Sequence, residues 1–166
     1  ETLSVAIGQG YDLTTPLQMA LVTASVGNGG TRYRPLILDR VETIEGEVVH
    51  QNLPQVAGKI PASARTLSIV QQGLWGAVNG ERGTASRARL KDIEVAGKTG
   101  TSQVVGRKEG GDDYLPPHLR PHAWFVAYAP AGSPRIAVAV LIENGEHGSS
   151  AAGPIAREMV KTYLRA

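Results

Sequence analysis

Residues 96–104 read Ala96-Gly97-Lys98-Thr99-Gly100-Thr101-Ser102-Gln103-Val104, and valines on both sides extend this stretch as a strand. A strand interior normally avoids glycine, because glycine loses much backbone entropy on folding and packs no side chain. Gly97 and Gly100 therefore predict that something approaches this backbone closely. Lys98, Thr99 and Thr101 add an ammonium group and hydroxyl groups beside the N–H groups of a strand edge. The pattern predicts a seat for a carboxylate, with a peptide-like ligand along the strand.

The composition is that of one folded domain. The chain has 166 residues, of which 42% are apolar and 19% are charged, so it can bury a core. The net charge is only +2 and 5% of the residues are aromatic, which disfavours nucleic-acid binding. The densest basic group, which is Arg87, Arg89 and Lys91, is interpreted as a solvated surface.

Several kinds of site and segment are absent from the sequence. It contains no cysteine, which excludes a disulfide, a thiolate metal site and a cysteine nucleophile. It has no signal peptide and no apolar run long enough to span a membrane. Residues 1–7 already alternate like a strand, so we expect the chain to be a piece of a longer protein.

The pattern predicts, in order, a helix, a hairpin, a helix, three strands and a helix. Thr15 is a suitable N-cap, and Pro16 suits the first helical position. The expected elements are a short strand at 3–7, a helix from 16 to about 26, a hairpin at 36–50 that turns at 45–46, a connection at 51–61, a helix at 63–79, a helical turn within 83–90, the strands at 94–105, 122–129 and 135–142, and a helix from about 151 to 164.

The apolar pattern predicts which faces are buried. Strand 135–142 is almost wholly apolar, so we expect it to be central and covered on both faces. This order of elements predicts an α+β fold, an antiparallel sheet with helices packed on it. The core stripe expected of the first helix is Leu17, Ala20, Leu21 and Ala24, and that of the second is Leu67, Val70, Leu74 and Val78.

A loop of about 16 residues between Val105 and Pro121 is long for a compact domain and is expected to be functional or mobile. His118 and His122 within and after it have the i, i+4 spacing of a helical metal pair. Pro121 lies between them and argues against that helix. We therefore do not expect a metal site here.

Taken in order, these segments resemble a known family. Lys98-Thr99-Gly100-Thr101 resembles the Lys-Thr-Gly motif of penicillin-binding proteins and serine β-lactamases, whose other motifs are Ser-x-x-Lys and Ser-Asp-Asn. Residues 8–19 (GQGYDLTTPLQM) and 123–130 (AWFVAYAP) are similar to segments of class B penicillin-binding proteins. Residues 142–145 (IENG) and 151–156 (AAGPIA) resemble the ending of its elongation-type branch, the penicillin-binding protein 2 group.

The chain also departs from that family. No serine is followed three residues later by lysine, and no Ser-x-Asn occurs. In the family, both motifs precede the region matched here. The resemblance therefore implies that residues 1–166 are the C-terminal portion of one transpeptidase domain of the penicillin-binding protein and serine β-lactamase-like fold. The upstream portion, with the nucleophile, is missing, so this fragment alone is expected to be inactive.

The activity that the resemblance implies is that of a peptidoglycan D,D-transpeptidase, which cross-links the cell wall by serine acyl transfer without a cofactor or metal. Lys98 and Thr101 would be its catalytic residues here. Lys98 would add positive potential, and the N–H of Thr101 would be one oxyanion-hole donor. The substrate-binding residues would be Thr99, Gly100, Thr101 and Ser102, with Thr99 and Thr101 holding the terminal carboxylate.

The resemblance also implies binding partners and a cellular location. The partners are peptidoglycan stem peptides ending in D-Ala-D-Ala, β-lactams that mimic them, and the upstream half of the same domain. A membrane peptidoglycan glycosyltransferase of the elongation machinery is a further candidate partner, whereas nucleic acid is not. The place is the periplasmic or extracytoplasmic face of a bacterial inner membrane, with the anchor in the missing N-terminal part.

Three alternatives remain at this stage. The first is a β-lactam sensor or a β-lactamase relative on the same fold, which residues 8–19 disfavour. The second is a non-catalytic scaffold module, which the absence of Ser-x-x-Lys from the parent would favour. The third is a hydrolase triad of Glu143, His147 and Ser149, which lacks a nucleophile-elbow pattern.

Overall fold

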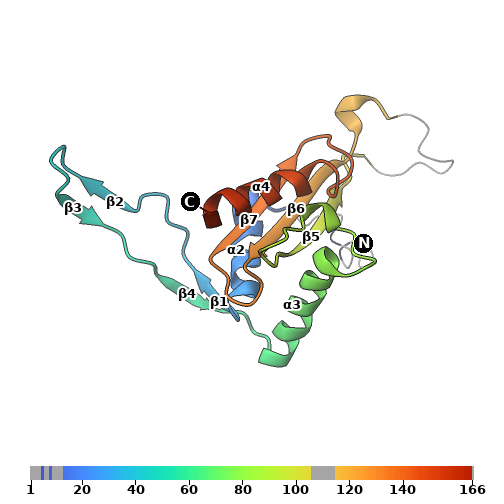
Figure 1. Ribbon diagram of the computed structural model, residues 1–166. Coiled ribbons are helices and arrows are strands. Elements are labelled where there is room, and N and C mark those ends of the chain that lie inside the picture. Colours follow the sequence, from blue (N-terminus) through green and yellow to red (C-terminus); the bar gives the residue numbers. More distant parts are fainter. Residues whose placement is uncertain (1–4, 6–7, 9–12, 106–114, 166) are drawn as a thin grey trace.

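The computed structural model describes residues 5, 8, 13–105 and 115–165. Its centre is an antiparallel sheet of β5 (Ala96–Ser102), β6 (His122–Ala129) and β7 (Ile136–Ile142), in the order β5-β6-β7. Gly100 pairs with Trp124, and Thr101 pairs with Ala123, which also pairs with Ile142. Helices cover this sheet (Figure 1), which confirms the expected α+β class.

The main core lies on one face of the sheet. Successive residues of a strand point to opposite faces, and Ala123, Phe125 and Ala127 of β6 are completely buried. This face is covered by α4 (Ala152–Arg165), whose Ala152, Ala156 and Val160 are buried. The 3-10 turn η1 (Ser86–Ala88) and the end of α3 (Ala64–Asn79) complete the core. Burying this apolar surface is the main favourable contribution to folding.

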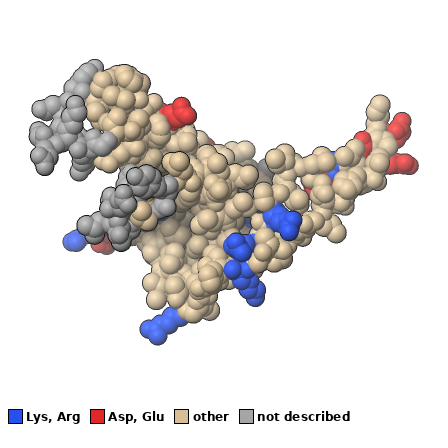
Figure 2. Space-filling model, turned by 180° about the vertical axis from the view of Figure 1, so that it is seen from behind, with Lys and Arg blue, Asp and Glu red and all other residues tan. Residues whose placement is uncertain are grey.

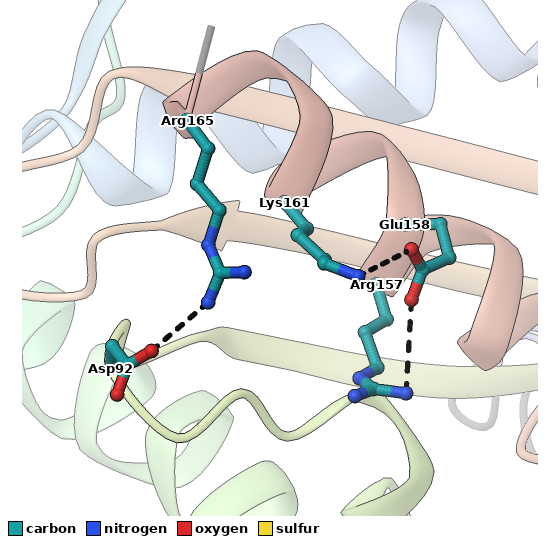
Figure 3. A network of polar contacts seen from close by, with 5 residues as sticks. All are labelled: Asp92, Arg157, Glu158, Lys161 and Arg165. Carbon is teal, nitrogen blue, oxygen red and sulfur yellow. Dashed lines mark hydrogen bonds and ion pairs between the residues drawn. The ribbon is translucent and has the colours of Figure 1, made fainter.

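Three ion pairs lie on the outer side of α4, and one of them joins the helix to another segment (Figure 3). Arg165 Nη2 donates to Asp92 Oδ2 at 3.0 Å, which joins the end of the helix to the loop after η1. Glu158 lies between Arg157 and Lys161 on the same helix. These side chains are exposed, so each pair contributes little to stability.

The second face is covered by α2 (Pro16–Gly27), which packs on β6 and β7. Gly27 lies on the ring of Tyr128, and a Cβ at Gly27 would be 2.9 Å from Tyr128 Cγ. Burial raises the pKa of the Tyr128 hydroxyl. The helices α2 and α4 lie on opposite faces of β7, so both faces of this strand are covered, and this explains its apolar sequence. Its expected central position is wrong within the described residues, where β7 is an edge strand and β6 is central.

The first helix begins as predicted, but its buried face differs from the prediction. Thr15 accepts from the N–H of Gln18, whose side chain accepts from the N–H of Thr15, so the two form a capping box. Of the expected stripe, Leu17 is 51% exposed, whereas Ala20, Leu21 and Ala24 are half-buried. The buried residues are Thr23, Ser25 and Gly27, because the two hydroxyls donate to carbonyls within the helix and their small side chains allow close packing.

The second helix, α3, begins at the expected N-cap Ser63, which accepts from the N–H of Thr66. Leu67 and Val78 of its predicted stripe are buried, whereas Val70 is 43% exposed. Leu74 is half-buried, so the expected stripe fails only at Val70. The basic group of the sequence is partly structural, because the guanidinium of Arg89 donates to the carbonyls of Val78 and Gly80 at the end of this helix.

A two-stranded arm projects from the body (Figure 1), and its acidic side chains gather at the far end (Figure 2). The expected hairpin is confirmed as β2 (Arg40–Glu42) paired with β3 (Val48–Gln51) around the turn at Gly46. Residues 36–38 are not a strand, however, and the expected connection at 51–61 contains β4 (Val56–Lys59), which pairs with β1 (Thr31–Tyr33). The prolines and Gly58 there suggested a connection, but the chain accommodates Gly58 with a positive φ beside a register shift.

Two expectations fall largely outside the described residues. Of the expected strand at 3–7, the structure describes only Val5, which is helical. Of the expected long loop, residues 106–114 lie outside the description, and the 3-10 turn η2 (Pro117–Leu119) follows. Within the described part of the chain, no helix combines the length and apolar character needed to cross a bilayer.

Candidate active site

The candidate site lies on β5, at an edge of the sheet. In the described residues β5 pairs with β6 alone, so its other edge has no strand partner. Lys98 and Thr101 are exposed, and Thr99, Gly100 and Ser102 are half-buried. The structure therefore brings all five predicted site residues onto one accessible strand. A strand edge of this kind can bind an extended peptide through backbone hydrogen bonds.

The ammonium group of Lys98 lies against its own strand. Lys98 Nζ donates to the carbonyl oxygen of Thr99 at 2.9 Å and to Thr99 Oγ1 at 3.1 Å. Neighbouring side chains leave opposite faces of a strand, so the lysine side chain bends around the strand to reach Thr99. The Thr99 hydroxyl accepts from Lys98 and keeps its own hydrogen to donate. A positive charge and a hydroxyl donor thus lie together, which suits binding of a carboxylate.

The two glycines of the motif are explained in part by packing within the protein. A Cβ at Gly97 would be 2.6 Å from the Val126 carbonyl oxygen and 2.9 Å from Ala127 Cβ, so the neighbouring strand excludes a side chain there. A Cβ at Gly100 would be 3.1 Å from Trp124 Cβ. The close approach predicted from Gly97 is therefore made by β6. At Gly100 the contact with β6 is milder than at Gly97.

The loop after β7 was missed by the sequence reasoning as a part of this site. Gly148 is buried, and a Cβ there would be 2.8 Å from the Gly100 carbonyl oxygen. Asn144, in the same loop, binds the chain that enters β6. The only local signal was the dipeptide Asn144-Gly145, whose residue types favour a left-handed turn; Asn144 has a φ of 54°.

The structure does not support the two other chemical readings of the sequence. Among the described residues, no hydrogen bond joins the side chains of Glu143, His147 and Ser149 into a triad. His118 lies in η2 and His122 begins β6, where its Nδ1 accepts from the Asn144 N–H at 2.9 Å. No cluster of three potential metal ligands exists within the ranges that the structure describes.

The sequence and structure match known proteins along nearly the whole chain. A family model of the penicillin-binding protein transpeptidase domain matches residues 1–161. The peptidoglycan D,D-transpeptidase MrdA of Haemophilus influenzae is 37% identical over 99% of this chain, which covers 26% of that protein. The peptidoglycan D,D-transpeptidase PbpA of Mycobacterium tuberculosis is 32% identical over 96% of the chain, which covers 31% of that protein.

Solved structures agree. PBP2 of Pseudomonas aeruginosa, in complex with WCK 5153, has a TM-score of 0.76 and 37% identity over 100% of this chain. Penicillin-binding protein A of M. tuberculosis, as a ceftriaxone acyl-enzyme, has a TM-score of 0.79 and 28% identity over 97%. The chain spans 34% and 35% of these two structures. It belongs to the penicillin-binding protein transpeptidase domain family, and its relatives include the penicillin-binding protein 2 group that its sequence resembles.

Proposed function

We propose that this chain supplies the Lys-Thr-Gly strand of a peptidoglycan D,D-transpeptidase, an acyltransferase that cross-links the cell wall. The observation that carries the proposal is the accessible edge of β5, where the ammonium of Lys98 is held beside the hydroxyl of Thr99 and the exposed Thr101 follows. The family membership and the activity in the names of the relatives support it.

The nucleophile belongs to another part of the parent protein. The chain has no Ser-x-x-Lys and no Ser-x-Asn, and it spans about a quarter to a third of the relatives' lengths. We infer that residues 1–166 are the C-terminal portion of one transpeptidase domain. In this assignment an upstream portion carries the reactive serine, its lysine base and the second motif, and it completes the site beside β5.

The proposed reaction proceeds through two acyl transfers. The serine oxygen bonds to the carbonyl carbon of the penultimate D-Ala, and the bond to the terminal D-Ala breaks, so that D-Ala leaves with a proton. An amine of a neighbouring stem peptide then attacks the acyl-enzyme, forms the cross-link and releases the serine. In both steps the N–H of Thr101 donates to the oxyanion, and Lys98 stabilises negative charge. Thr99 and Thr101 bind the terminal carboxylate, Gly100 admits it and Ser102 extends the seat.

Binding of β-lactams follows from the same seat. Penicillin-binding protein A of M. tuberculosis has been solved as acyl-enzymes with ceftriaxone, imipenem and penicillin G. The carboxylate of such a compound suits the Lys98 and Thr101 end of β5 in this chain. We place the parent at the extracytoplasmic face of a bacterial inner membrane, anchored through its upstream part, with a membrane peptidoglycan glycosyltransferase as a candidate partner.

Labelling with a fluorescent penicillin tests this division of roles. The full-length parent is expected to form a stoichiometric, hydrolysis-sensitive adduct, and the isolated chain of residues 1–166 is expected to form none. Denatured parent and parent pretreated with unlabelled penicillin G serve as controls. A stoichiometric adduct on the isolated chain would refute the missing nucleophile, and an unlabelled native parent would favour the scaffold alternative.

A further inference from the structure

The loop between β7 and α4 crosses the end of the sheet at which Thr101 and Ser102 lie. It starts after Ile142, which pairs with Ala123, the partner of Thr101. A Cβ at Gly145 would be 3.1 Å from Ala123 Cβ, so the loop passes against the central strand β6. At Gly148 it reaches β5, and α4 begins at Ala152. One loop therefore contacts all three strands of the sheet.

Asn144 fastens this loop to the chain that leads into β6. Its backbone N–H donates to Nδ1 of His122 at 2.9 Å, which requires the ring proton of His122 to be on Nε2. Its side-chain Nδ2 donates to the carbonyl oxygens of Arg120 at 2.8 Å and of His118 at 3.2 Å. All of the donors of Asn144 thus bind the segment 118–122. His122 is the residue that pairs with Ser102 of β5.

A second set of contacts joins the same two segments. The backbone N–H of Glu146 donates to the carbonyl oxygen of Pro121 at 2.9 Å, and its carboxylate lies 3.6 Å from Arg120 Nε. Asn144 and Glu146 both have positive φ, of 54° and 62°. Such conformations are uncommon for residues other than glycine, and they persist where surrounding contacts determine them. The backbone of this loop is therefore held in one shape by the segment before β6.

Gly148 packs directly against β5, so the shape of the loop determines what contacts that strand. A Cβ on Gly148 would lie 2.2 Å from the carbonyl oxygen of Trp124, 2.8 Å from that of Gly100 and 3.2 Å from the N of Gly100. The contact is on the sheet face that holds Ala123 and Phe125, since Gly145 of this loop and Gly153 at the start of α4 lie against those side chains. Because the backbone is close-packed here, no empty space separates Gly148 from Gly100. A shift of Gly148 would therefore shift the middle of the Lys-Thr-Gly strand.

We propose that Asn144 and Gly148 are positioning residues for the Lys-Thr-Gly strand. Asn144 fixes the loop on the entry to β6, and Gly148 supports Gly100 from the face opposite to that of the Lys98 side chain. The inference rests on the function proposed above for β5. Donors in such a site must be held within about half an ångström of their working positions. A misplacement of about 1 Å can lower a rate about a hundredfold.

The test uses the full-length parent and the second-order rate constant of its acylation by penicillin G. Asn144→Asp replaces the amide donor by an oxygen that faces two carbonyl oxygens, and we expect acylation about 10- to 100-fold slower. Asn144→Gly keeps the positive φ and the N–H bond to His122, so it should recover part of that loss. Gly148→Ala should also slow acylation, because its Cβ displaces Gly100 or Trp124.

The chain offers a matched control on the arm. Asn52, which directly follows β3, makes the same kind of contact: its Nδ2 donates to the carbonyl oxygen of Leu38 at 2.8 Å. Asn52→Asp should leave the acylation rate unchanged. Circular dichroism and thermal unfolding of each variant monitor the fold, and acylation is compared at a temperature well below the unfolding midpoints of both variants.

A double-mutant cycle separates positioning from general stability. If Asn144 acts through β5, Thr101→Val should slow acylation less in the Asn144→Asp background than in the unmodified parent, because the seat is already displaced. Independent, multiplying effects of the two substitutions would overturn the inference, as would a wild-type rate in Asn144→Asp while the parent acylates normally. Failure of the unmodified parent to acylate would instead overturn the proposed function, and this inference with it.

Discussion

Replacing Thr101 by valine in the full-length parent exchanges a hydroxyl for a methyl group on β5. Valine is nearly the same shape as threonine and is well suited to a strand. Thr101 is exposed and pairs with the small residue Ala123, so the new methyl group has room. If the hydroxyl donates to a substrate carboxylate, its loss weakens a hydrogen bond to a charged group by about 1.5–3 kcal/mol. This corresponds to acylation by penicillin about 10- to 100-fold slower.

Lys98→Ala should slow acylation at least as much, because it also removes the positive charge that lies beside Thr99. Lys98→Arg should restore only part of the rate, since a broad planar group replaces a compact ammonium. The assay is the second-order acylation rate constant, with circular dichroism as the control for folding. Wild-type rates in folded Thr101→Val and Lys98→Ala would show that β5 is merely structural, and the mechanism proposed for this half of the site would be wrong.

Two further substitutions test the packing around the sheet. Gly27→Ala places a Cβ about 2.9 Å from the ring of Tyr128 and should destabilise the parent by about 1–3 kcal/mol in denaturant unfolding; an unchanged midpoint would mean that α2 moves freely on the sheet. Met159 lies on the outer stripe of α4 with Ile155 and Tyr163, and all three side chains are more than two-fifths exposed. The second substitution is Met159→Lys. If an upstream half covers this stripe, the lysine should reduce self-association of the isolated chain in sedimentation and should lower the unfolding midpoint of the parent. An unchanged unfolding midpoint of the parent would contradict such a cover.

The sequence predicted the sheet and its helices well where local signals and burial agree. Strands β5, β6 and β7 and the caps at Thr15 and Ser63 are where the pattern placed them. It failed for the short and largely exposed strands β1 and β4. The pairing of β1 with β4 joins residues separated by the whole hairpin, and neither strand has an apolar alternation to reveal it. Such short, exposed strands are determined by their pairing rather than by propensity.

The first helix failed for a different reason. A helical stripe of Leu17, Leu21 and Ala24 satisfies the usual pattern of a buried face, but the face against the sheet carries Thr23 and Gly27. A helix that packs closely on an aromatic ring needs small residues more than apolar ones, and hydroxyls that donate within the helix can be buried at low cost. Periodicity of apolar residues alone cannot detect that arrangement.

The candidate site was predictable to the extent that its chemistry is local. Lys98, Thr99 and Thr101 follow one another on one strand, so one motif names them. Asn144 and Gly148 act on the same strand from more than forty residues further along, through backbone contacts that leave no mark on residue type other than asparagine and glycine. Those two residue types are also ordinary in turns. Only the folded structure, in which Gly148 packs against Gly100, shows that this turn adjoins the candidate site.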